Sequence, residues 1–322
     1  MIRIGIDAMG GDFAPFEALK GAIQAQSEIK DCQLVLYGVE SELQHIAQEQ
    51  GWDLSALEIV DCPDVIGMAE HPVRAFTTKP QASLSVGFQQ LASKETQAFI
   101  SAGNTGAMLV GSMHVIKPVE GLDRPCLTAA VPRMDMHPGI LLDVGANADC
   151  KPEHLQQFAI LGSLLAKALY NLESPKVGLL NIGEEPEKGN LLSKAAHQLL
   201  AQTENIEFVG NIEGRDLFGP LADVIVCDGF TGNTVVKVCE GMYYRLAKRG
   251  VQDEYLDKFN FKHYGGSPIM GVNAPVIVGH GITKADTFVK MIELAMDTVK
   301  SDLVSMVQSS MKALQQEKLN EQ

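Results

Sequence analysis

Residues 224–233 have the sequence VIVCDGFTGN, and this stretch decides the fold. An apolar run, as expected of a strand buried on both faces, ends at a loop of Asp, Gly, Thr and Asn, and a helix-like stretch follows. The same succession occurs in four more loops: DAMGGD from Asp7, SAGNTG from Ser101, DVGAN from Asp143 and NIGEE from Asn181. Strands and helices therefore alternate along the chain, which predicts a doubly wound α/β fold.

The five loops predict one binding site for an anion, most simply phosphate. In an open α/β sheet the loops after parallel strands gather at one edge, where ligands bind. Glycine lets the backbone approach a ligand, and a helix start offers free N–H groups and the positive end of the helix dipole. A single loop of this kind is better explained as an ordinary strand-to-helix turn, whereas five together favour a site. The residues expected to bind phosphate or substrate are Asp7, Gly10, Gly11, Asp12, Ser101, Gly103, Asn104, Thr105, Gly106, Asp143, Gly145, Asn147, Asn181, Glu184, Asp228, Gly229, Thr231, Gly232 and His280.

Two side chains in these loops are candidates for catalysis. Lys188 precedes a helix in EEPEKGN and could hold phosphate or polarise a carbonyl, or it could only neutralise the three nearby glutamates. Asn233 lies where the helix after DGFTGN is expected to begin, so it could bind substrate or simply cap that helix. His280, between two glycines, could face the site or only stabilise a turn. Cys227 is better explained as an inert core thiol than as an acyl nucleophile, because it alternates with Ile225 in a buried strand.

The composition narrows the classes of protein to which the chain can belong. Of its 322 residues 46% are hydrophobic and only 20% are charged, which argues against disorder. The net charge of −14 argues against nonspecific binding to nucleic acid, because a phosphate backbone needs a basic surface. Six scattered cysteines without a CxxC pair, eight histidines without metal-ligand spacing and no apparent signal peptide predict a cytoplasmic protein without a metal or a cofactor.

The order of elements predicts one compact domain over residues 1–322, with room for a smaller lobe near 240–270. Residues 128–131 and 140–142 are expected to pair as strands around a turn, and one C-terminal helix is expected to carry the apolar side chains from Phe288 to Val307.

A local basic patch is expected on one helix face, where Arg245, Lys248 and Arg249 follow the i, i+3, i+4 spacing. In so acidic a chain, such a patch suggests an acidic partner or an anionic membrane surface, although charge runs are more often only a solvated face.

Several of these motifs together resemble the PlsX-type phosphate acyltransferases. The matching segments are IDAMGGD from Ile6, SAGNTGA from Ser101, LDVGAN from Leu142, LLNIGEE from Leu179 and VCDGFTGN from Val226. They occur in the family's order and cover nearly the whole chain.

The resemblance implies a three-layer α/β/α, Rossmann-like sandwich similar to phosphotransacetylases and isocitrate-dehydrogenase-like enzymes. It implies a homodimer that converts acyl carrier protein thioesters and inorganic phosphate into acyl phosphate for phospholipid synthesis. The product would pass to a membrane glycerol-3-phosphate acyltransferase, which implies peripheral association with the inner face of the plasma membrane. Lys188 and Asn233 stand at the family's two catalytic positions, and no cofactor is implied.

The chemistry of this reaction needs no covalent acyl-enzyme, because phosphate is itself a nucleophile and a thioester is already electrophilic. Three alternatives remain open at this point. One is a phosphotransacetylase acting on acyl-CoA, and another is a protein that binds acyl phosphate or acyl carrier protein without chemistry. The third is an oxidoreductase, against which the absence of GxGxxG argues.

Overall fold

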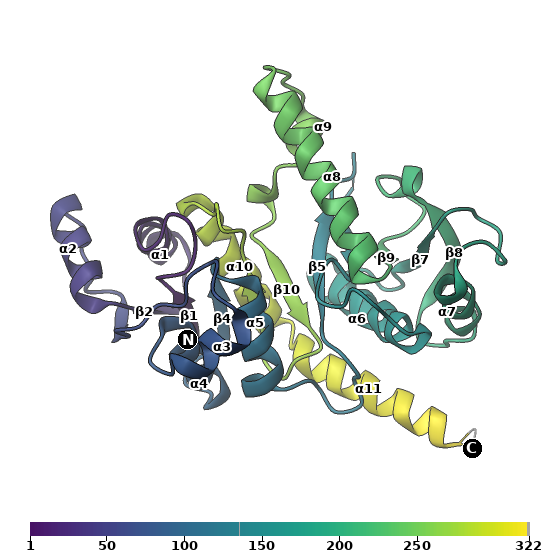
Figure 1. Cartoon of the computed structure of the whole chain (residues 1–322), viewed down its shortest axis with the longest axis horizontal. Coiled ribbons are helices and arrows are strands. Elements are labelled where there is room, and N and C mark those ends of the chain that lie inside the picture. Colours follow the sequence, from purple (N-terminus) through teal and green to yellow (C-terminus); the bar gives the residue numbers. More distant parts are fainter. Residues whose placement is uncertain (135, 321–322) are drawn as a thin grey trace. The chain divides into compact units, whose positions relative to one another are not determined.

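The computed structural model describes residues 1–134 and 136–320 (Figure 1). Contacts between residues divide the chain into two compact units. Unit 1 comprises Met1–Pro118 and Lys262–Val304, and unit 2 comprises Val119–Phe261 and the C-terminal helix from Ser305 onward. The expectation of a single domain over the whole chain stays a prediction.

Unit 1 is built on a sheet of mainly parallel strands. The strand order is β3 (Glu58–Asp61), β2 (Cys32–Gly38), β1 (Ile2–Asp7), β4 (Ala98–Ser101), β11 (Val276–Val278) and β10 (Ser267–Met270). All neighbours are parallel except β10, which runs antiparallel to β11. The helices are α1 (Phe16–Glu28), α2 (Glu40–Gln50), α3 (Pro72–Thr78), α4 (Ser83–Ala92), α5 (Thr105–Gly111) with a π-helical turn (Ser112–Ile116), and α10 (Ala285–Lys300).

The central strand β1 has a core on each face. Ile4 and Ile6 are fully buried in a cluster with side chains of α1 and α10. Gly5 points the other way, where a side chain would collide with the rings of Tyr37 and Phe99. Phe99 in turn packs against Phe88 of α4 with ring centroids 5.1 Å apart. Helices therefore cover both faces of this sheet, as the sequence predicts.

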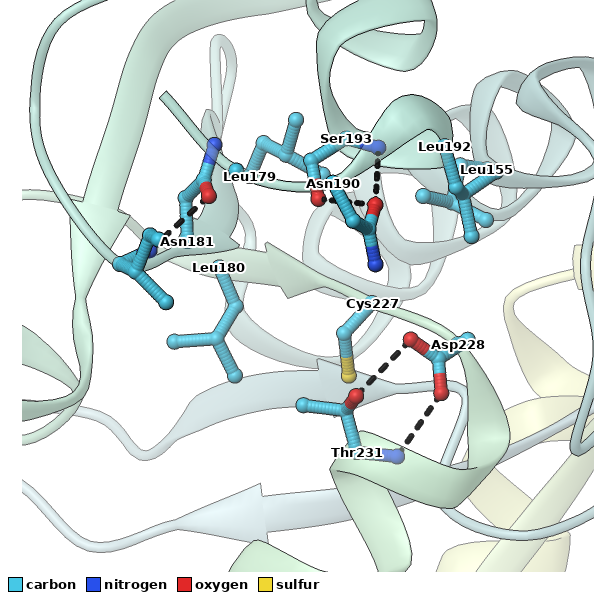
Figure 2. A pocket seen from close by; sticks show the side chains of 12 residues that line it. Leu155, Leu179, Leu180, Asn181, Asn190, Leu192, Ser193, Cys227, Asp228 and Thr231 are labelled. Atoms are coloured by element: carbon cyan, nitrogen blue, oxygen red, sulfur yellow. Dashed lines mark hydrogen bonds between the residues drawn. The ribbon is translucent and has the colours of Figure 1, made fainter.

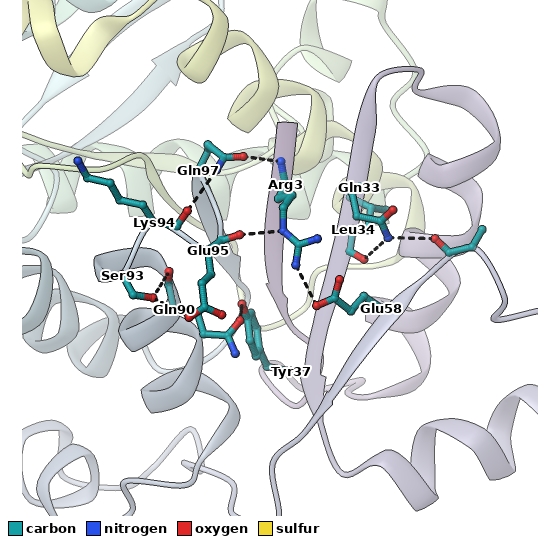
Figure 3. A network of polar contacts seen from close by, with 11 residues as sticks. Arg3, Gln33, Leu34, Tyr37, Glu58, Gln90, Ser93, Lys94, Glu95 and Gln97 are labelled. Atoms are coloured by element: carbon teal, nitrogen blue, oxygen red, sulfur yellow. Dashed lines mark hydrogen bonds and ion pairs between the residues drawn. The ribbon is translucent and has the colours of Figure 1, made fainter. Parts of the chain in front are cut away.

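A polar network fixes β1 at the end opposite its loop (Figure 3). The backbone N–H of Arg3 donates to Gln97 at 2.7 Å, and its guanidinium donates to the Glu95 carbonyl at 2.8 Å and to Glu58 at 2.9 Å. Because Glu58 begins β3 and Gln97 precedes β4, these bonds hold the register of the strands whose other ends carry the loops.

Unit 2 repeats the plan of parallel strands with one antiparallel edge strand. The order is β5 (Cys126–Val131), β6 (Gly139–Leu142), β9 (Val224–Val226), β7 (Lys176–Asn181) and β8 (Glu207–Glu213), with only β5 and β6 antiparallel to each other. The helices are α6 (Pro152–Tyr170), α7 (Leu191–Ala201), α8 (Gly229–Lys248) and α9 (Glu254–Asp257), with a 3-10 turn at Gly214–Asp216. A further helix, α11, spans Leu303–Asn320.

The fold class is confirmed, and the predicted hairpin is present as β5 and β6. Three expectations about elements are corrected. Helix α8 begins at Gly229 rather than Asn233, because Asp228 caps it with an acceptor for the Thr231 N–H at 2.8 Å. The C-terminal helix is two helices, divided at Asp302, whose φ of +53° interrupts the helical backbone. Strands β8 and β10 and helices α3 and α4 were not expected.

In the part of the chain that the structure describes, no helix is both long and apolar enough to cross a membrane.

Candidate functional site

In unit 1, two of the five polar loops and the loop after β11 leave the same edge of the sheet, because β1, β4 and β11 run parallel. Asp7 ends β1, Ser101 ends β4, and His280, which is half-buried, follows β11. Asp12 joins two of these loops, since its backbone N–H donates to the Gly281 carbonyl at 2.7 Å. The expected gathering of loops at one edge is thus present within this unit.

Asp7 is the buried anchor of the first two loops. Its carboxylate accepts hydrogen bonds from Ser83 Oγ at 2.6 Å, Ser101 Oγ at 2.7 Å and the Met9 N–H at 3.2 Å. Ser101 Oγ in turn accepts from the Gly103 N–H at 2.9 Å. A side chain at Gly10 would press on both Asp7 and Ser101, so only glycine fits between the loops. Burial raises the pKa of Asp7, and its hydrogen bonds oppose that shift.

The Asn104 side-chain amide joins the start of α5 to the 67–70 loop. Its Oδ1 caps α5 by accepting from the Ala107 N–H at 3.0 Å. Its Nδ2 contacts the carbonyls of the 67–70 loop, at 2.9 Å for Glu70 and 3.1 Å for Met68. Both ends of the Asn104 amide are thereby hydrogen-bonded to other residues of the protein. Thr105, in the first turn of α5, is exposed to solvent.

In unit 2, Asp143 plays the part that Asp7 plays in unit 1. It follows β6 and is completely buried. Its Oδ1 accepts from the N–H groups of Leu127 (2.9 Å), Ala146 (3.1 Å) and Gly145 (3.2 Å), and its Oδ2 accepts from the backbone N–H and the side-chain amide of Asn147 (2.6 and 2.9 Å). Burial raises the pKa of Asp143, and these donors oppose the shift.

The first turn of α8 rests directly on this loop. The Gly229 N–H donates to the Asn147 carbonyl at 2.8 Å, and a side chain at Gly232 would overlap the Asp143 carbonyl. Asn233 lies inside the helix rather than at its cap, and its Nδ2 donates to the Val144 carbonyl at 3.1 Å. Glycines at 229 and 232 therefore allow the helix to seat Asn233 against the DVGAN loop.

The loop after β7 carries Lys188, with its backbone fixed and its ammonium group exposed. The Lys188 N–H donates to the Glu185 carbonyl at 3.0 Å, and Asn181 Nδ2 donates to the Lys188 carbonyl at 3.1 Å. The stem of Lys188 lies over Gly183. Within residues 1–134 and 136–320, no ion pair engages the Lys188 ammonium group, which disfavours the explanation that it neutralises the adjacent glutamates.

Arg215 pairs with one of these glutamates, Glu184. Its guanidinium donates to Glu184 at 3.2 Å and pairs with Glu213, while Asp216 lies 4.0 Å away. The carboxylates of Glu184, Glu213 and Asp216 come close to one another, and the Arg215 guanidinium lies among them and offsets part of their charge.

A cavity of about 260 Å³ lies between the Lys188 loop and the start of α8 (Figure 2). Three of the residues expected in the site line it: Asn181, Asp228 and Thr231. The Asp228 carboxylate caps α8 through the N–H and the hydroxyl of Thr231, both at 2.8 Å. Parallel packing of β7 and β9 brings these residues together, as predicted for loops at one sheet edge.

Cys227 also lines this cavity but is suited to packing rather than to attack. It is only 3% exposed, and its thiol donates to the Asp143 carbonyl at 3.6 Å. Burial raises the pKa of this thiol well above its usual value, which suppresses the nucleophilic thiolate.

The basic patch lies at the outer end of α8, where Arg245 and Lys248 are exposed in the last turn and Arg249 follows directly. Lys248 lies over the Tyr244 ring at 6.0 Å.

Two side chains that support the loops were missed by the sequence analysis. Ser83 reaches the Asp7 carboxylate from α4, a helix that was not expected. Asn211 of β8 donates to the Glu185 carbonyl at 2.8 Å, and its Oδ1 lies 3.0 Å from His197 Nδ1. Both act across more than 20 residues of sequence, so no local pattern marks them.

Comparison with known proteins identifies relatives of the whole chain. Residues 2–254 match the family described as "Fatty acid synthesis protein". A phosphate acyltransferase from Syntrophomonas wolfei is 39% identical over 312 residues, which cover 95% of this chain and 98% of that protein. A phosphate acyltransferase from Salinibacter ruber is 40% identical, with 91% of this chain and 93% of that protein covered.

Solved structures show the same fold at lower sequence identity. A phosphotransacetylase from Streptococcus pyogenes matches with a TM-score of 0.66 at 15% identity, covering 92% of this chain and 94% of that one. The EutD phosphotransacetylase from Staphylococcus aureus gives a TM-score of 0.64 at 18% identity, covering 93% and 94%.

Proposed function

The chain belongs to the phosphate acyltransferase family and is therefore an acyltransferase, and we propose that it transfers a fatty acyl group from acyl carrier protein to inorganic phosphate. The product is an acyl phosphate that serves phospholipid synthesis, and the transfer is reversible. The Lys188 loop is the observation that carries this proposal. Its backbone is fixed by Asn181 and Glu185 while its ammonium group stays exposed, as a group that binds a phosphate requires.

Lys188 and Asn233 divide the stabilisation of charge. The Lys188 ammonium group attracts the phosphate and, as the thioester is attacked, the developing oxyanion. Asn233 has two amide hydrogens and uses one on the Val144 carbonyl, so the second is available to the same oxyanion or phosphate. The first turn of α8 directs the positive end of its helix dipole toward the anion, and Gly229 and Gly232 keep the approach free of side chains.

The attack itself is direct. An oxygen of hydrogen phosphate forms a bond to the carbonyl carbon, the carbon–sulfur bond breaks, and the carrier leaves as a thiol that takes up the proton lost by the phosphate. The raised pKa and burial of Cys227 support a route without a covalent acyl-enzyme.

The carrier protein is proposed as the acyl donor because of the charge at the end of α8. Arg245, Lys248 and Arg249 are exposed on a chain of net charge −14, and they suit an acidic protein. We further propose a homodimer that works at the inner face of the plasma membrane and passes its product to a membrane glycerol-3-phosphate acyltransferase. The long alkyl chain of the product favours delivery beside a membrane.

The test is an acyl-phosphate assay. Long-chain acyl carrier protein and phosphate are mixed with the protein, and acyl phosphate is trapped with hydroxylamine. We expect phosphate-dependent hydroxamate, and a loss of two orders of magnitude or more in kcat for Lys188→Ala. Lys194→Ala is the matched control, because Lys194 is exposed on the adjacent helix α7. Product from acyl-CoA but not from the carrier protein would refute the proposed donor, and full activity of folded Lys188→Ala would refute the proposed role of Lys188.

A further inference from the structure

The residues that line the cavity beside the Lys188 loop make it unsuited to phosphate. Its walls include Leu155 of α6, Leu180 of β7 and Leu192 of α7 (Figure 2). No lysine, arginine or histidine is among the residues that line it, and the one charged group, Asp228, would repel an anion. Phosphate is therefore a poor occupant, whereas an uncharged apolar group loses little on entering.

Most polar side-chain atoms in the lining are hydrogen-bonded to neighbours within the chain. Asn190 Oδ1 accepts from the Ser193 N–H at 2.8 Å and its hydroxyl at 3.0 Å. Asn181 Oδ1 accepts from the Ile182 N–H at 2.9 Å. An alkyl chain that packs against these bonded atoms leaves their hydrogen bonds intact, so covering them leaves none of these atoms unsatisfied.

The position of the cavity links it to the reaction. One wall, from Asn181 to Ser193, belongs to the segment that contains Lys188, and the opposite wall, at Asp228 and Thr231, is the first turn of the helix that carries Asn233. A chain inside the cavity would have its carboxyl end beside both segments.

We propose that this cavity binds the part of the acyl chain nearest the thioester, and that Leu192 and Leu180 set the preferred chain length. The proposal rests on the proposed function. A dry cavity of about 150 Å³ accepts a six-carbon benzene ring, so 260 Å³ accommodates an alkyl segment of roughly ten carbons by the same ratio. Complete burial of a methylene raises kcat/KM about fourfold, and because the cavity opens to solvent beside the exposed Ile182, each methylene should raise kcat/KM by at most this factor until the cavity is full.

The first measurement is the profile of kcat/KM against acyl-chain length for wild type, Leu192→Phe and Leu192→Ala. The larger phenyl ring should move the point where the profile levels off to shorter chains, and alanine should move it to longer ones. Leu191→Phe is the matched control, because Leu191 is the preceding residue and 88% exposed. Leu180→Phe narrows the cavity from the other wall and repeats the test if a Leu192 variant fails to fold.

A second measurement does not depend on turnover. Fluorescent cis-parinaric acid is titrated into wild type, Leu192→Phe and Leu191→Phe. We expect binding that weakens about tenfold in Leu192→Phe and is unchanged in Leu191→Phe. An active wild type whose chain-length profile and fatty-acid affinity are both insensitive to Leu192 and Leu180 would overturn the cavity proposal and leave the proposed function intact. Binding that depends on Leu192 in a protein without acyltransferase activity would overturn the proposed function and support the cavity.

Discussion

Replacing the buried carboxylate of Asp143 by an amide, in Asp143→Asn, should destabilise the protein more than the same change at Asp7. The two aspartates occupy equivalent places, each at the end of a strand and each buried, and Asn is nearly isosteric with Asp. The difference lies in their donors. Asp143 accepts only N–H groups, from backbone and from the Asn147 amide, whereas Asp7 accepts from the hydroxyls of Ser83 and Ser101 as well as from backbone.

The magnitude follows from counting the donors that lose an acceptor. In Asp143→Asn the new NH₂ group can replace the oxygen that faces the two Asn147 donors or the one that faces three backbone donors. At least two buried donors are then orphaned, at ~1–3 kcal/mol each, or roughly 2–6 kcal/mol. In Asp7→Asn a serine hydroxyl can rotate and accept from the new NH₂ group, so the cost is closer to the roughly 1–3 kcal/mol of one orphaned N–H.

Burying a charged carboxylate costs free energy, and for this reason burial raises the pKa of each aspartate. Both variants remove that charge and therefore recover part of this cost. The difference between the two variants is therefore the decisive quantity. It is measured by urea unfolding followed by circular dichroism, because the single tryptophan, Trp52, lies in unit 1 and would not report on unit 2. An Asp143→Asn protein as stable as wild type, or an Asp7→Asn protein that is the less stable of the two, would refute this reasoning.

Three further predictions concern the same loops and helices. Gly232→Ala should cost roughly 1–3 kcal/mol in urea unfolding and lower kcat, because its methyl group overlaps the Asp143 carbonyl. His154 accepts a backbone N–H at the start of α6, and burial lowers its pKa, so its contribution to stability is complete above the unfolded pKa of about 6.5 and is lost as pH falls through the folded value. His154→Asn should flatten the fall in urea midpoint between pH 8 and pH 5, and an unaltered slope would contradict this. Asn211→Leu should lower kcat by roughly tenfold with a smaller change in KM, because it releases the Lys188 loop, and Asn211→Gln should restore part of the loss in the hydroxylamine assay.

The sequence predicts the strands and loops of this chain well where the signal is local. The apolar run before Asp228 and the glycines after it identify β9 and its loop without any tertiary information. The start of α8 is misplaced because Gly229, Thr231 and Gly232 have low helix propensity, and only their packing on the Asp143 loop makes them helical. Tertiary contact overrides propensity at that point.

Other features escape prediction because they depend on distant partners. Strand β8 has the sequence EFVGNIE, with a glycine at φ +94° and charged ends, and it becomes a strand by pairing with β7 at the sheet edge. The apolar spacing continues from α10 into α11, so nothing in the periodicity shows the break at Asp302. The sequence assigns Lys188 and Asp143 to the loops where the structure has them, whereas Asn233 lies one turn inside α8 rather than at its start. The sequence cannot show that Arg215, rather than Lys188, pairs with Glu184.

Helix α8 has 20 residues, yet only Gly229 and Gly232 of them are buried. The turns of α8 that follow Asn233 bury almost no side chains, and Val238, Met242 and Tyr244 are more than half exposed there. Hydrogen exchange should therefore be slow around Asn233 and fast toward Lys248. Substitutions in these C-terminal turns can change the exposed surface of the helix, while the packing of its first turn on the Asp143 loop stays unchanged. The two ends of this one helix can therefore diverge in sequence independently of each other.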